Sequence, residues 1–163
     1  MRPRALVVLV GSLLVAPSLG AQRIASAPRA TPVFRADAVT ESRAGTVQIG
    51  AGVVVPAGYL VRIALEGGVG ATVRDADWRP SGRLDATARV LVDPFREARW
   101  GVALGGGAGM RWERGEGPRP VALVVVALQG PAGGRRWVRG VEAVVGGGLR
   151  LGVTVARPAP GRR

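Results

Sequence analysis

Residues 99–113 carry a strict two-residue alternation, which restricts this stretch of chain to a β-strand. Even-numbered positions are apolar or small and run from Trp100 to Trp112, whereas odd-numbered positions hold glycine, alanine and charged residues. The distance between the two tryptophans corresponds to about 40 Å of strand, or about 30 Å of height at a tilt of about 40°. This height and the aromatic ends match the apolar outer band of a barrel that crosses a lipid bilayer.

The first 21 residues have the three parts of a secretory signal peptide. Arg2 and Arg4 precede an apolar run over residues 5–16, and small residues end at Ala21. The apolar run is too short for a membrane-spanning helix. We therefore expect cleavage next to Ala21 and export of a mature chain of about 142 residues, the size of one domain.

Composition narrows the classes of function. All 23 basic residues are arginine and the formal net charge is +12, but the arginines are spread along the chain and no nucleic-acid motif accompanies them. Anionic lipid head groups are therefore the expected partner of this charge. The absence of Cys and His excludes disulfides, the usual zinc sites and His- or thiol-based catalysis. No spacing of acidic residues indicates acid–base chemistry, so we expect no enzymatic activity, no cofactor and no metal.

Similar alternation recurs along the rest of the chain. It predicts six strands, over residues 46–55, 59–73, 84–92, 100–112, 121–129 and 137–155. The stretch 121–129 is apolar on both faces, which leaves its orientation undecided. Short connections predict antiparallel neighbours, and hence an all-β, up-and-down (meander) β-barrel over residues 44–157.

Two features leave the strand count between six and eight. Residues 22–43 are rich in Ala, Pro, Ser and Arg, and we expect a mobile segment there, although Val33–Val39 could form one short strand. The alternation keeps its phase through Gly146–Gly148, which favours one long strand over a hairpin. A strand at 33–39 and a break at 146–148 would raise the count to eight. Residues 158–163 are expected to form a disordered tail.

The composition of the second face indicates which side of the barrel faces outwards. A solvated sheet face usually carries many polar side chains, whereas the odd positions of 101–109 would offer only glycine and alanine to water. Inside a narrow barrel, such small residues leave room for charged side chains on the opposite wall. We therefore expect the apolar face outside and an ion-paired interior formed by Arg62, Glu66, Asp85, Arg89, Arg111, Glu142 and Arg150. The alternative is that these charges solvate the outer face of a soluble sheet.

Aromatic and basic residues mark the expected ends of the strands. Tyr59, Trp100, Trp112 and Trp137 lie at strand ends and are expected to anchor the barrel at the membrane interfaces, ordinary core aromatics being the alternative. Trp78 falls in the longest expected loop, Asp75–Gly82. The basic loop residues expected to contact anionic lipid head groups are Arg74, Arg79, Arg83 and Arg114.

With its signal peptide, its two-residue alternation and the tryptophans at the ends of its expected strands, the chain resembles the small outer-membrane β-barrel proteins of Gram-negative bacteria over about residues 44–157. It departs from that class in its aromatic content of 4% and in lacking a C-terminal aromatic residue. The resemblance implies an integral outer-membrane protein with a structural or envelope role, in contact with membrane lipid and lipopolysaccharide. The alternative is a soluble periplasmic β-barrel or sandwich that binds an apolar ligand. A spurious reading frame, suggested by the absence of Lys and Asn, is a further alternative.

Overall fold

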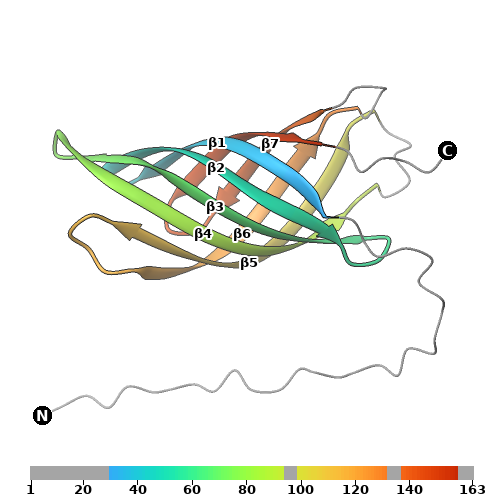
Figure 1. Ribbon diagram of the computed structural model, residues 1–163, viewed down its shortest axis with the longest axis horizontal. Helices are drawn as coiled ribbons and strands as arrows, with labels where there is room; N and C mark the ends of the chain where they lie inside the picture. The colour runs from blue at the N-terminus through green and yellow to red at the C-terminus, as the bar shows by residue number, and fades with distance from the viewer. Residues whose placement is uncertain (1–29, 94–98, 132–136, 158–163) are drawn as a thin grey trace, which may run out of the picture.

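The computed structural model describes residues 30–93, 99–131 and 137–157, which form eight antiparallel strands closed into one β-barrel (Figure 1). The strands are β1 (Thr31–Glu41), β2 (Ala44–Pro56), β3 (Val61–Arg74), β4 (Asp77–Leu91), β5 (Gly101–Glu113), β6 (Arg119–Gln129), β7 (Val138–Val145) and β8 (Leu149–Ala156). Each strand pairs with its neighbours in chain order, and β1 pairs with β8. The predicted meander barrel is confirmed, at the upper end of the predicted strand count.

Strand β1 closes the barrel, although it lies within the segment 22–43 that the sequence predicts to be mobile. In the register of the sheet, Arg35 faces Gly50 of β2 on one side and Thr154 of β8 on the other. This pairing provides hydrogen-bond partners for backbone N–H and C=O groups of β2 and β8, which would otherwise be unpaired edge strands. The boundary at residue 44 is therefore wrong, whereas the stretch Val33–Val39 marks the centre of β1. The expected signal peptide (1–21) and tail (158–163) lie outside the described residues.

The structure also contradicts the single long strand predicted over residues 137–155. Gly146–Gly148 form a tight hairpin between β7 and β8, in which Val145 pairs with Leu149. All three glycines have positive φ angles (153°, 60° and 120°), which glycine adopts at little cost. Register partners share one face of a sheet, so a loop with an odd number of residues keeps the alternation in phase. Phase alone therefore cannot separate a three-residue hairpin from a continuous strand.

The barrel has two distinct ends, which we call the hairpin end and the terminal end. The hairpin end holds the connections 42–43, 75–76, 114–118 and 146–148, and the terminal end holds the start of β1 and the finish of β8 (Figure 1). The expected loop Asp75–Gly82 is instead a two-residue turn, Asp75-Ala76, followed by the start of β4. The β3–β4 hairpin extends past β5, because β4 pairs with β5 only from Ser81 onwards.

Burial alternates along the strands with apolar side chains outside. Ile49 is 67% exposed and its cross-strand partner Val69 is 62% exposed, whereas Glu66, three residues before Val69 on β3, is 2% exposed. The structure also decides the orientation of β6, whose even-numbered residues face out and whose odd-numbered residues, such as Val125, face in. Within the described strands, the outward face between the barrel ends carries no charged residue. The burial pattern is thus the reverse of that in a water-soluble barrel.

Candidate functional site in the barrel interior

Eight charged side chains fill the centre of the barrel and form one continuous set of ion pairs, which we call the central network. Its members are Arg35 and Asp37 of β1, Glu66 of β3, Arg83, Asp85 and Arg89 of β4, Glu142 of β7 and Arg150 of β8. Every one of these residues is less than a tenth exposed. Four arginines face four carboxylates, so the formal charge of the central network is zero.

One half of the central network is a closed ring of four side chains. Arg35 Nη1 donates to Glu66 Oε2 and, at 2.9 Å, to Glu142 Oε1. Arg89 completes the ring, donating from Nη2 to Glu66 Oε1 at 3.0 Å and from Nη1 to Glu142 Oε2 at 2.7 Å. Each carboxylate therefore bridges two guanidinium groups, and the ring ties β1, β3, β4 and β7 together across the lumen.

The other half of the central network is a chain that continues from Arg35. Asp37 accepts from Arg35 Nη2 at 2.7 Å and from Arg83 Nη2 at 2.6 Å. Arg83 also pairs with Asp85, which in turn accepts from Arg150 Nη1 at 2.6 Å. Positive and negative groups thus alternate from Arg89 to Arg150, and no two like charges are joined.

Glycine lies beside almost every member of the central network. In the register of the sheet, the cross-strand partners are Arg35 and Gly50, Asp37 and Gly152, Glu66 and Gly52, Arg83 and Gly68, Asp85 and Gly109, Arg89 and Gly105, and Glu142 and Gly152. A Cβ added at Gly68 would lie 3.0 Å from Arg83 Nε. The small residues therefore make room for charges on the adjacent strand, whereas the sequence pattern predicts that they make room for charges on the opposite wall.

The arrangement makes burial of these charges energetically possible. Moving an ion out of water costs several kcal/mol unless a partner and further hydrogen bonds compensate. Here each guanidinium has at least one carboxylate within hydrogen-bond distance, and the apolar wall formed by Leu123, Val125 and Val144 packs the remaining interior. The interior is thus filled by side chains at its middle. Chemically, this arrangement cross-links strands and obstructs the lumen.

Five of the seven residues predicted to form the interior network belong to it, namely Glu66, Asp85, Arg89, Glu142 and Arg150. The other two lie nearer the ends. Arg62 is half-buried at the terminal end, where it donates to the carbonyl oxygens of Gly58 and Val61. Arg111 lies at the hairpin end, where it pairs with Glu41 at 3.3 Å and donates to the carbonyl oxygen of Gly147. It borders a cavity of about 350 Å³ there.

Three members of the central network are not predicted from the sequence: Arg35, Asp37 and Arg83. Arg35 and Asp37 lie in the segment expected to be mobile, where their alternation with Phe34 and Ala36 was the available signal. Arg83 was expected to contact lipid from a loop, but it is 1% exposed and belongs to β4. The turn-forming residues before it, including Pro80, suggested a loop. Proline is tolerated at this position because β4 there pairs only with β3.

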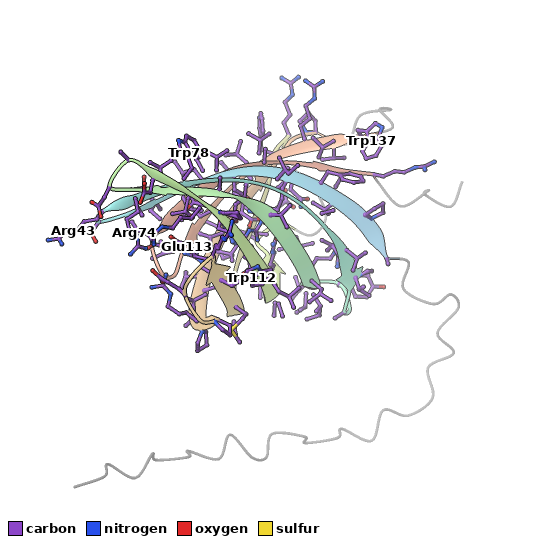
Figure 2. The ribbon with its side chains drawn as sticks, turned by 60° about the vertical axis from the view of Figure 1, so that its left-hand side comes forward. Arg43, Arg74, Trp78, Trp112, Glu113 and Trp137 are labelled. Atoms are coloured by element: carbon purple, nitrogen blue, oxygen red, sulfur yellow. The ribbon has the colours of Figure 1, made fainter. Side chains whose placement is uncertain are left out.

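Exposed aromatic residues lie at both ends of the barrel. Tyr59, Trp100 and Trp137 lie at the terminal end, and Trp112 lies towards the hairpin end. Figure 2 labels Trp112 and Trp137. Trp78, which was expected in a loop, lies near the start of β4 and is 70% exposed. Trp112 covers its cross-strand partner Gly82 on the outer face, and a Cβ there would lie 2.6 Å from the indole Nε1.

Several basic residues at the hairpin end have acidic partners. Arg74 pairs with Glu113 at 3.5 Å, and Arg79 pairs with Asp77 at 3.9 Å. Arg114 is exposed in the β5–β6 connection. Figure 2 shows Arg43 and Arg74 at this end, far from Trp137. Three of the four predicted lipid-contacting arginines, Arg74, Arg79 and Arg114, are thus at the hairpin end, and Arg83 is not at the surface.

The described residues offer no group of three or more acidic side chains placed to hold a metal ion. In this part of the chain, no helix has the length and apolar character needed to cross a membrane. Comparison with protein-family models and with curated proteins finds no match to this sequence.

Proposed function

We propose that this chain is a non-enzymatic, integral outer-membrane β-barrel protein of a Gram-negative bacterium, with a structural role in the envelope and a closed interior. The observation that carries the proposal is the reversed burial: apolar side chains cover the outside, and the central network occupies the inside. In water, the exposed face would present a continuous apolar surface far larger than soluble monomers usually carry. In a bilayer, the same face is matched to its surroundings.

The composition of the outward face supports insertion in lipid. A charged side chain at the bilayer midplane costs roughly 2–4 kcal/mol, and the described outward positions between the barrel ends carry none. The closed sheet also leaves no unpaired strand edge, as a bilayer requires. Aromatic residues are exposed at both ends of the barrel, and the ends of a membrane-spanning barrel are where tryptophan and tyrosine are favoured.

The filled lumen supports a structural role over transport. Five strands contribute charged groups that are paired across the barrel, so passage of ions would require breaking several buried ion pairs. We expect little or no steady conductance in planar bilayers. Large, stable, ion-selective channels would contradict a closed interior.

The second candidate is a soluble periplasmic barrel that binds an apolar ligand. Such a protein holds its ligand in an apolar lumen. Here charged groups occupy the middle of the lumen. A mainly apolar hollow of about 720 Å³ lies on the outer face of the barrel, beside the exposed side chains of Phe34, Ile49 and Trp112. The exposed apolar face favours the membrane protein.

Fractionation of cells that express the full chain tests the proposal. We expect the protein in outer membranes after a sodium carbonate wash, and we expect the folded barrel to migrate differently from the heated chain on denaturing gels. Release into the soluble periplasmic fraction would contradict membrane insertion and support the second candidate.

A further inference from the structure

The two ends of the barrel differ in their balance of charge. At the hairpin end, the described arginines are Arg43, Arg74, Arg79, Arg111, Arg114 and Arg119, and the described acids are Glu41, Asp75, Asp77, Glu113 and Glu116. Ion pairs join most of these groups, for example Arg119 and Glu116 at 3.0 Å. This end is close to neutral, because six positive groups face five negative ones.

The terminal end carries an excess of positive charge. Its described arginines are Arg62, Arg99, Arg139 and Arg157, whereas Asp93 is its one acidic residue within the described ranges. Arg99, Arg139 and Arg157 are exposed, and no ion pair joins any of them to another described residue. Since the central network is neutral, the positive charge of the described barrel is concentrated at this end.

These exposed arginines lie along one side of the terminal rim: Arg99 shortly before β5, Arg139 on β7 and Arg157 directly after β8. Gly130, at the finish of β6, donates its backbone N–H to the carbonyl oxygen of Arg139 at 2.8 Å, and a Cβ there would lie 3.7 Å from the Trp100 ring. Arg139 is also the register partner of Val155 near the end of β8. We call Arg99, Arg139 and Arg157, with Trp100 and Trp137 beside them, the basic arc.

We infer that the basic arc binds the phosphate groups of anionic glycerophospholipids in the leaflet that surrounds the terminal end. The inference rests on the proposed function, because it places the rim at head-group level. Guanidinium groups form paired hydrogen bonds to phosphate oxygens, and neighbouring tryptophans occupy the same interfacial depth. The hairpin end, whose charges nearly cancel, offers a weaker attraction. The lipid-binding arginines are therefore at the end opposite to Arg74, Arg79 and Arg114.

Lipid selectivity of the folded full chain in phosphatidylcholine vesicles tests this inference. Electron paramagnetic resonance with spin-labelled phosphatidylglycerol or phosphatidylcholine measures how strongly each lipid associates with the protein. The triple variant Arg99→Gln, Arg139→Gln, Arg157→Gln removes the charges of the basic arc. The matched control Arg43→Gln, Arg114→Gln, Arg119→Gln removes the same number of exposed arginines from the hairpin end.

We expect the unmodified barrel to prefer phosphatidylglycerol, with a selectivity ratio that falls to about one in the arc variant but not in the control. Molar salt, at which the Debye length is about 3 Å, should weaken the preference in the unmodified barrel. An equal loss of selectivity for phosphatidylglycerol in the two variants, or no such selectivity in the unmodified barrel, would overturn the inference. A spectrum without any protein-associated lipid, for either label, would instead contradict the proposed membrane insertion.

Discussion

Glu66 of β3 and Gly52 of β2 are cross-strand partners, and a Cβ added at Gly52 would lie 2.8 Å from the Glu66 Cγ. The same relationship recurs around the central network, where a glycine lies beside seven of its eight charged residues. Glycine is usually unfavourable inside a strand. In this barrel it provides the volume that buried arginine and carboxylate side chains require.

Gly52→Ala should therefore destabilise the barrel. The new methyl group would displace Glu66 or the β3 backbone, and overpacking of this kind costs about 1–3 kcal/mol. Urea unfolding of the lipid-inserted protein, followed by tryptophan fluorescence, measures the loss. The matched control is Gly45→Ala on the same strand, where no atom lies within 4 Å of the added Cβ. Equal stabilities of the two variants would show that the space beside Glu66 is not needed.

Glu142→Gln tests the ring of the central network. The amide removes the negative charge that Arg35 and Arg89 share, so that Glu66 alone would bridge them. Breaking a buried pair in this way is expected to cost about 3–5 kcal/mol in unfolding free energy. Adding Arg89→Met to the Glu142→Gln variant restores charge balance and should recover a large part of that loss. Simply additive losses in the double variant would argue against coupling through the ring.

The turn between β3 and β4 offers a stabilising substitution. Asp75 and Ala76 both adopt positive φ angles, 50° and 69°, in a two-residue hairpin loop. Asp tolerates this conformation better than Ala, for which it costs roughly 1 kcal/mol. Ala76→Gly should therefore raise the unfolding free energy by about 1 kcal/mol. In contrast, Ala71→Gly, within β3 itself, should lower it by about 0.5–1 kcal/mol. A loss of stability in Ala76→Gly would contradict the turn geometry.

Much of the barrel follows from the two-residue alternation, because that pattern defines both strand and face. It predicted the strands that carry Glu66, Arg89 and Glu142 and the inward direction of these side chains. The alternation could not locate the β7–β8 hairpin, because a three-residue loop preserves phase. Nor does it identify β1 securely, since Ala36 and Ala38 supply only a weak apolar signal on the outward face.

Sequence patterns cannot identify the partners in the ion pairs, for a different reason. Arg35 and Glu142 are 107 residues apart in the chain and meet only because β1 closes the barrel near β7. The interior predicted from the sequence does not include β1 and contains three acidic and four basic residues. Adding Arg35, Asp37 and Arg83, and placing Arg62 and Arg111 nearer the ends, balances the charges of the centre.

A pair of leucine substitutions separates a lipid-facing wall from a water-facing one. Leu65 lies next to Glu66 on β3, at the level of the central network, and Leu60 directly precedes β3 at the terminal end; both are about half exposed. In a bilayer, Leu65→Arg should cost about 2–4 kcal/mol and Leu60→Arg about 0–1 kcal/mol, because the penalty depends on depth. Unfolding measurements in vesicles check this difference. Similar small effects at the two positions would indicate that water contacts both.

The most direct test of the account is the environment of Ile49, at the centre of the outward face of β2. The chain contains no cysteine, so Ile49→Cys and, at the hairpin end, Arg43→Cys each give a single site for a nitroxide label. Power-saturation measurements on the reconstituted protein compare collisions with oxygen, which concentrates in lipid, and with a water-soluble nickel chelate. We predict that oxygen dominates at Ile49 and the chelate dominates at Arg43. Equal access of the chelate to both labels would contradict a membrane-spanning barrel.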